Sequence, residues 1–312
     1  MFASNANYPQ NEPLIGNEAL QTEITGINNI IERGGRDVKH NIAETFTYSY
    51  KLLEIDRTST PVLLTSTIQM YRRDKELITQ ILFEKLGVPA MFIQNQCALS
   101  LYASGHTEGT VIDIGGGSTS IIPINQEDSK TESFQTLEFG GKDLTDYMTR
   151  LCARNPKAYS DWIGYDTLKE NYCYVAMDYE QEKETLSSDN ERFYRLPDGT
   201  SIAIGEERFT CVEALFQPDL LGLKCPGIHE ATKESILRCN AAGPRRPINH
   251  WNNMFITGGC SLIPGMKERF QHEMTKLAPV EEKANVNVKT VLPSEGQAYS
   301  AWVGGSILSS LS

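Results

Sequence analysis

The chain has 312 residues, about twice the length of a typical domain, so its length favours two domains. Its 40 acidic residues outnumber 29 Lys and Arg, and the net charge of −11 argues against a surface that coats DNA or RNA. A hydrophobic fraction of 40% excludes wholesale disorder, and no apolar run is long enough for a transmembrane helix. Seven cysteines without a CxxC pair predict buried free thiols rather than a zinc site or a disulfide framework.

Short apolar runs alternate with helical patterns in the first third of the chain. Residues 1–13 are rich in Asn and Pro and predict an N-terminal extension that is irregular or extended. The apolar run 61–65 predicts a buried strand, and apolar residues at helical spacing over 74–86 predict an amphipathic helix that ends before a Gly-Val-Pro sequence. A strand over 90–93 and a buried helix over 96–103 follow.

A glycine-rich turn between two apolar strands is the first segment with chemical potential. A strand over 110–112 runs into Asp113, and a strand over 120–124 leaves after Gly115, Gly116 and Gly117. Three glycines remove the Cβ atoms that would keep a phosphate away from backbone N–H groups, and Asp113 is placed to hold a metal ion or a water. The same pattern also occurs in tight turns without a ligand, and a fold needs glycine wherever φ is positive.

The second half of the chain repeats the pattern of strand, glycine turn and helix. A strand over 254–257 leads into Gly258 and Gly259, and a helix over 266–277 follows. The remaining predicted elements are helices over 142–151, 165–184 and 229–239, a hairpin between 192 and 204, and loops over 218–226 and 241–247. This alternation of strands and helices favours mixed α/β layers.

Several consecutive segments resemble actin and the actin-related proteins, in that family's order and at nearly its spacing. They are PVLLT (61–65), LSLYASG (99–105), DLTDY (143–147), CYVAMDYEQE (173–182), LPDGTSIAIGEERF (196–209), EALFQPDLLG (213–222), GIHEAT (227–232), TGGCSLIPGMKERF (257–270) and WVGGSILSSLS (302–312). The resemblance covers roughly 14–312. It implies the actin/Hsp70/sugar-kinase fold, an α/β fold of two related domains with a central nucleotide cleft.

The resemblance also implies a division into subdomains. Residues 14–60 would be a remnant of subdomain 2, residues 61–103 with 294–312 a truncated subdomain 1, and residues 104–293 subdomains 3 and 4. The family's N-terminal phosphate-binding hairpin and its C-terminal helices have no recognisable counterpart in this sequence. Both belong to subdomain 1, which we therefore expect to be truncated.

On the phosphate side of the implied site, the family's residues are only partly matched. Gln96 matches the glutamine that positions the attacking water, and Asp113 matches the aspartate that orders metal-bound water. Gly115 and Gly117 match glycines of the second phosphate loop. Gly116 stands in the same loop but replaces an acidic residue, and Ser120 replaces a histidine associated with hydrolysis.

On the adenosine side, more of the family's residues are matched. Lys169 and Glu170 match the pair near the ribose and adenine, and Gly258 and Gly259 match the adenosine-side turn. Gln297 and its neighbour occupy the region of a lysine that usually helps to frame the base. An intact site would hold ATP or ADP with Mg²⁺, and the sequence leaves open whether this chain binds a nucleotide at all.

These substitutions lead us to expect a degenerate ATPase, with Gln96 and Asp113 as vestigial catalytic residues. The expected function is that of an actin-related structural subunit in a larger assembly. Its partners would be protein subunits that cover the truncated subdomain, without direct nucleic-acid binding and without filament formation by this chain alone.

Two alternatives remain open. One is a slowly hydrolysing ATP-binding switch whose missing hairpin comes from a partner chain, and the other is a fragment of an ordinary actin-related protein. No Lys or Arg precedes Arg33, so the sequence predicts neither a secretory signal nor an Arg-rich transit peptide. A cytoplasmic or cytoskeletal location is expected, and an organellar assembly is left open.

Overall fold

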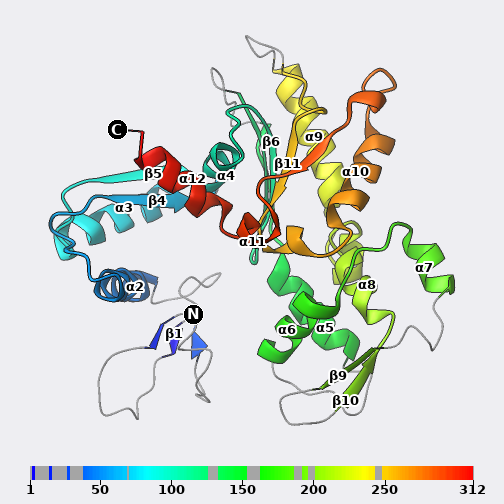
Figure 1. Ribbon diagram of the computed structural model, residues 1–312, viewed down its shortest axis with the longest axis horizontal. Helices are drawn as coiled ribbons and strands as arrows, with labels where there is room; N and C mark the ends of the chain where they lie inside the picture. Colours follow the sequence, from blue (N-terminus) through cyan, green and yellow to red (C-terminus); the bar gives the residue numbers. More distant parts are fainter. Residues whose placement is uncertain are drawn as a thin grey trace. The chain divides into compact units, whose positions relative to one another are not determined.

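A computed structural model (Figure 1) describes most of the chain. The described residues are 2–3, 14–15, 27–28, 38–68, 70–125, 133–152, 162–185, 192–195, 201–242 and 248–311. They form two compact units, Met1–Gln94 and Asn95–Ser312. The finer division into four subdomains stays a prediction. No helix within the described ranges is both long enough and apolar enough to span a bilayer.

The first unit combines small sheets with two helical segments. The short strands β1 (Phe2–Ala3), β2 (Leu14–Ile15) and β3 (Ile27–Asn28) form an antiparallel sheet in the order β2-β1-β3. Strand β1 is the only part of the expected 1–13 extension that lies within the described residues, and it has the extended form that was one of the two expected. Helix α2 (Val38–Leu52) follows and was not predicted from the sequence.

The two predicted strands and the amphipathic helix of the first unit are present, but the first strand is mostly half-buried rather than buried. Strand β4 (Val62–Ser66) pairs with β5 (Met91–Asn95), and helix α3 (Arg72–Gln80) continues directly into a π-helical turn, η1 (Ile81–Lys85). The apolar stripe of α3 and η1 packs with α2 in a small core. That core consists of Ile42, Ala43, Ile78, Ile81, Leu82, Leu86 and Val88.

A mixed sheet of five strands organises the second unit (Figure 1). Its order is β12-β11-β6-β7-β8, with bounds β6 Gly109–Ile114, β7 Thr119–Ile124, β8 Gln135–Leu137, β11 Met254–Thr257 and β12 Val288–Thr290. Strand β11 runs parallel to β6 and β12, whereas β6, β7 and β8 are antiparallel neighbours. The parallel pair places the carboxyl ends of β6 and β11 at one edge of the sheet.

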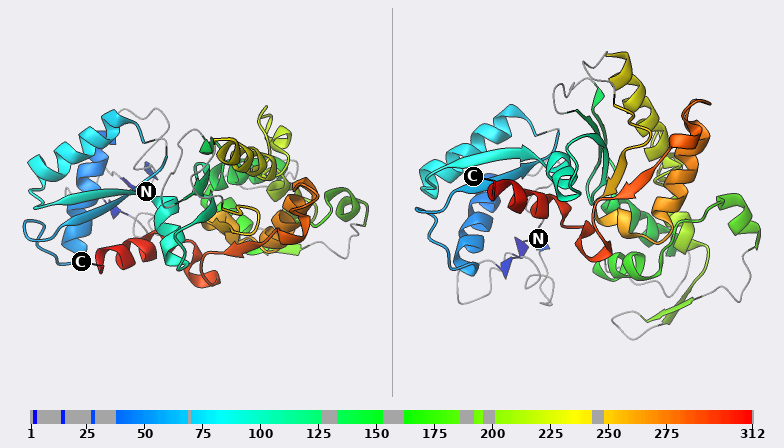
Figure 2. Two further views of the ribbon diagram at one scale, coloured as in Figure 1. Left: turned by 90° about the horizontal axis from the view of Figure 1, so that it is seen from above. Right: turned by 45° about the horizontal axis from the view of Figure 1, so that its top comes forward.

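Helices cover both faces of this sheet. Helices α4 (Gln96–Ala103) and α12 (Ser300–Ser309) pack together on one side, and α9 (Ile228–Ala241) and α10 (Met266–Leu277) lie on the other (Figures 1 and 2). Every residue of β6 and β7 is buried as a result. This double burial explains why most residues of the two strands are apolar, with no exposed polar face.

Further helices extend the core beyond the edge where the glycine turns lie. Helix α5 (Gly141–Cys152) packs against α6 (Trp162–Tyr172) and α8 (Glu207–Glu213), and the predicted hairpin is present as β9 (Arg192–Arg195) and β10 (Ser201–Ile204). The short elements of this unit are η4 (Pro218–Leu221), η5 (Gly259–Leu262), η6 (Lys283–Asn285) and α11 (Ser294–Gln297).

The prediction of one long helix over 165–184 is wrong. Helix α6 ends at Tyr172, and a separate helix, α7, spans Tyr179–Thr185. Between them the backbone N–H of Val175 donates to the carbonyl oxygen of Pro264 at 2.8 Å, so the chain uses its hydrogen bonds on a neighbouring loop. The side chain of Asp178 then accepts a bond from the N–H of Gln181 at 3.1 Å, in the first turn of α7. Long-range pairing therefore overrides helical periodicity here.

Two other predictions need smaller corrections. All seven cysteines are free, and six are buried as expected, but Cys225 is exposed because it follows η4 in the surface segment predicted as a loop. Of the loop predicted over 241–247, residues 243–247 lie outside the described residues. The turn of the β9–β10 hairpin, residues 196–200, also lies outside them.

Candidate functional site

Asp113 and Gln96 meet at the carboxyl end of β6. Asp113 is the last but one residue of the strand, and its carboxylate accepts a hydrogen bond of 2.9 Å from Nε2 of Gln96, the first residue of α4. Burial raises the pKa of the Asp113 carboxyl to about 6, although the bond from Gln96 acts in the opposite direction. The structure therefore brings together the two residues that the resemblance assigns to the water-positioning machinery.

Backbone hydrogen bonds join the turn after β6 to the first residues of α5. The carbonyl oxygen of Gly115 accepts from the N–H of Gly141 at 2.9 Å, and that of Gly116 accepts from the N–H of Lys142 at 2.7 Å. A methyl group on Gly116 or Gly117 would meet no atom within 4 Å, and neither residue has a positive φ. The fold itself does not require glycine at these two positions, so the turn leaves open space for another molecule.

Gly140 and Gly141 belong to the site although the sequence analysis did not single them out. A Cβ on Gly140 would lie 2.4 Å from the carbonyl oxygen of Gly115, so only glycine lets the two backbone segments approach. A Cβ on Gly141 would lie 3.0 Å from the Sγ of Cys260. A Gly-Gly pair directly before a predicted helix was the signal that could have identified them.

The glycine turn after β11 lies beside the first turn. Thr257 is opposite Asp113 in the parallel register, so the next residue, Gly258, packs against the end of β6. Gly258 has a φ of 88°, and a Cβ there would lie 2.6 Å from Oδ1 of Asp113. At Gly259, by contrast, a Cβ would meet nothing within 4 Å. Glycine is thus a requirement of the backbone at Gly258 and leaves open space at Gly259.

Lys169 of α6 is buried, and its ammonium lies against the first turn of α5. Its Nζ donates to the carbonyl oxygen of Gly141 at 3.0 Å, to Oγ1 of Thr145 at 2.8 Å and to Oδ1 of Asp166 at 2.5 Å. The side chain is 8% exposed. Its predicted companion Glu170 is exposed. The role of both residues near a ribose and adenine stays a prediction, but the structure shows the Lys169 ammonium bonded to three protein oxygens.

Two positions where the family has a lysine or a histidine carry neutral, buried side chains here. Nε2 of Gln297 donates to Oγ of Ser261 at 2.7 Å and to the carbonyl oxygen of Ile256 at 3.3 Å. Gln297 therefore links α11 to β11 and to η5 through hydrogen bonds. Ser120, in place of the histidine, is buried within β7. These side chains contribute packing and hydrogen bonds, without adding charge beside the turns.

The described part of the site fits a phosphate group in shape but not in charge. Open space lies beside Gly116, Gly117 and Gly259, whereas the ammonium of Lys169 is already paired with a carboxylate. Within the described ranges, no three His, Cys, Asp or Glu side chains converge so that they could hold a metal ion. Asp113, the residue matched to the family's aspartate, supplies one carboxylate at the end of β6.

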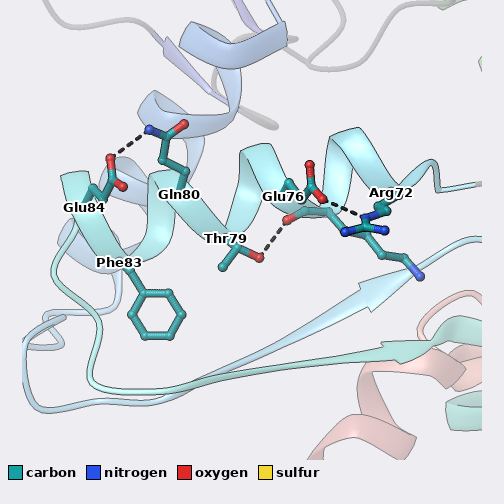
Figure 3. Close-up of a pocket in the computed structure, with 7 residues that line it drawn as sticks. Arg72, Glu76, Thr79, Gln80, Phe83 and Glu84 are labelled. Carbon is teal, nitrogen blue, oxygen red and sulfur yellow. Dashed lines mark hydrogen bonds and ion pairs between the residues drawn. The ribbon is translucent and has the colours of Figure 1, made fainter.

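A shallow hollow on α3 is a separate surface feature (Figure 3). Charged side chains line it, and Arg72 bonds Glu76 at 2.8 Å while Gln80 bonds Glu84 at 2.8 Å (Figure 3). The Arg72 side chain is 93% exposed. Pairs of this kind at a spacing of four residues are typical of a solvated helix face, and we assign no ligand to this hollow.

The fold and the site define a class: an α/β protein in which two glycine turns meet at the carboxyl ends of adjacent parallel strands, where such sheets bind ligands. The family model described as Actin matches residues 3–312, which is nearly the whole chain. This chain therefore belongs to the actin family. The resemblance stated from the sequence is confirmed, and the fold is an actin-like α/β fold.

Proposed function

We propose that this chain is an actin-like pseudo-ATPase that serves as a structural subunit of a larger, cytoplasmic or cytoskeletal protein assembly. The observation that carries the proposal is the contrast between shape and charge at the glycine turns. Gly116 and Gly117 leave space for a phosphate, but Gly116 stands where the family has an acidic residue, and Lys169 is bonded to Asp166 at 2.5 Å.

Phosphoryl transfer depends on neutralising the charge that develops around the γ-phosphate. In this site Asp113 carries a raised pKa of about 6, so at neutral pH it gives one carboxylate. Neither Gln297 nor Ser120 replaces the charge or the imidazole that the family has at those positions. These features support binding without turnover at most, and they support a role for the fold as a scaffold.

Exposed aromatic side chains on α12 support the subunit role. Trp302 is 73% exposed, and Tyr299, three residues earlier at the cap of the helix, is 67% exposed. Two large aromatic side chains are therefore exposed at the start of α12, one at its N-cap and one in its first turn. Exposed apolar surfaces of this kind mark protein interaction sites. We propose that a partner subunit binds there and that the chain does not form filaments by itself.

A second candidate function is that of a slowly hydrolysing, ATP-binding switch. The observation that favours it is the open space beside Gly116, Gly117 and Gly259, together with the intact Gln96–Asp113 hydrogen bond. In that case, other residues of this chain or of a partner chain would have to supply the rest of the phosphate clamp.

The test is to purify the native chain with its partners, denature it, and identify any released nucleotide by chromatography. A second portion of the native sample is incubated with ATP, and the phosphate released is measured. The pseudo-ATPase proposal expects no more phosphate than a denatured control releases. It also expects the chain to be folded and in a stoichiometric complex. Stoichiometric ATP or ADP together with turnover would overturn it in favour of the switch. For the subunit role, Trp302→Ala should weaken the complex, whereas Phe193→Ala, which removes a ring that is 72% exposed on β9, should leave it intact.

A further inference from the structure

The ammonium of Lys169 and the glycine turn after β6 both lie close to Gly141. A Cβ placed on Gly141 would be 3.7 Å from Nζ of Lys169 and 3.5 Å from Cα of Gly116. Because both distances are measured from the same point, the cation lies close to the turn where a phosphate would lie. A positive charge this close to an anion site would attract a phosphate strongly if no counter-charge were present.

Asp166 supplies that counter-charge from the same helix. It precedes Lys169 by three residues on α6, and its Oδ1 accepts bonds from Nζ of Lys169 at 2.5 Å and from Oγ1 of Thr145 at 2.7 Å. Thr145 in turn accepts a bond from Lys169 at 2.8 Å. The three side chains form a closed triangle of hydrogen bonds in which the lysine is buried and the aspartate is 29% exposed.

We infer that Asp166 determines ligand specificity at this site, because it neutralises Lys169 and so keeps phosphate anions away from the glycine turns. The inference rests on the proposed function and gives it a cause. A buried ammonium that is paired with a carboxylate presents little net charge, whereas one that loses its partner is an uncompensated buried cation. The anion that such a cation would recruit through the open space beside Gly116 is a phosphate or polyphosphate.

The experiment compares anion binding by the full chain and its Asp166→Asn variant. Asparagine has nearly the same shape and still offers an amide oxygen to Lys169, so it removes the charge and little else. We expect the variant to bind ADP about tenfold more tightly than the wild type, which corresponds to about 1.4 kcal/mol. Pyrophosphate serves as a second probe, since equal gains for both ligands place the effect at the phosphates rather than at the nucleoside.

Two controls separate this effect from a general change in charge. Glu234→Gln on α9 removes one exposed carboxylate that is paired with Arg238, and it should leave ADP affinity unchanged. The double variant Asp166→Asn/Lys169→Met should lose the gain, because the freed cation is then absent. A gain that persists in the double variant, or that appears equally in Glu234→Gln, overturns the inference.

Lys169→Met gives a test that does not depend on the Asp166 variant. Removing the ammonium leaves the Asp166 carboxylate without its counter-charge, so this variant should bind ADP more weakly than the wild type, in the opposite direction to the gain from Asp166→Asn. An ADP affinity that is unchanged or higher in Lys169→Met would overturn the inference, because the two charges would then not act on the anion site. Stoichiometric nucleotide and turnover in the native wild-type complex would instead contradict the proposed function. That result does not depend on the variants, so the two failures can be distinguished.

Discussion

Gly258 allows a sharp test of how the two glycine turns fit together. Its backbone has φ 88° and ψ 165°, a region that is essentially restricted to glycine, and an alanine there costs about 2 kcal/mol in strain. The new Cβ would also lie 2.5 Å from the carbonyl oxygen of Ile114 and 2.6 Å from Oδ1 of Asp113. Overpacking against a strand adds about 2 kcal/mol. Gly258→Ala should therefore destabilise the chain by about 4 kcal/mol.

The assay is thermal unfolding followed by circular dichroism, with urea unfolding to obtain the free energy. At this chain length, about 4 kcal/mol corresponds to a decrease in Tm of roughly 6 °C. Gly259→Ala is the matched control, because a Cβ at the next residue meets nothing within 4 Å; its free energy of unfolding should stay within about 0.5 kcal/mol of the wild type. Equal Tm values for the two variants would refute the arrangement of the turns described above.

Three further predictions concern buried charges of the second unit. The native state raises the pKa of Asp113 from 3.8 to about 6, so the wild type loses stability as the pH rises through that window. Asp113→Asn should therefore be up to about 3 kcal/mol more stable than the wild type in urea unfolding at pH 8, and this difference should disappear at pH 4. The native state lowers the pKa of His250 from 6.5 to about 4, so His250→Gln should lose less stability than the wild type, by up to roughly 3 kcal/mol, as pH falls through that window. Arg269→Met leaves the buried carboxylate of Glu213, whose oxygens lie 3.0 and 3.1 Å from the guanidinium, without its cation and should destabilise the chain by about 4 kcal/mol. Lys267→Met on the exposed face of α10 should cost less than about 0.5 kcal/mol. Equal Cm values for the two variants in urea would contradict this prediction.

Local patterns in the sequence predicted the elements around the site well. Helices α4 and α10 have the predicted bounds, and the β6–β7 hairpin is present, because apolar spacing and glycine punctuation act over a few residues. The failure at 165–184 has a different origin. The bond from Val175 to Pro264 joins residues far apart in the sequence, and no periodicity within the segment could reveal it.

The chemistry of the site was less visible in the sequence than its backbone. The residues Asp166 and Lys169 could be seen at a spacing of three on a predicted helix, a common surface ion pair. What the sequence did not indicate is that the lysine is 8% exposed and lies under the start of α5. Burial matters because an exposed ion pair contributes little to stability, whereas the loss of one partner of a buried pair leaves an uncompensated charge inside the protein.

The structure divides the glycines at and around the two turns into two groups. Gly140 and Gly258 stand where a Cβ would collide with backbone or with Asp113, so packing alone accounts for them. Gly116, Gly117 and Gly259 face open space, so packing does not account for them. Only the second group therefore argues for a ligand, and the argument concerns shape. Under our proposal, the pairing of the neighbouring cation with Asp166 lets this chain keep the shape of the phosphate turns without the charge that would hold a phosphate there.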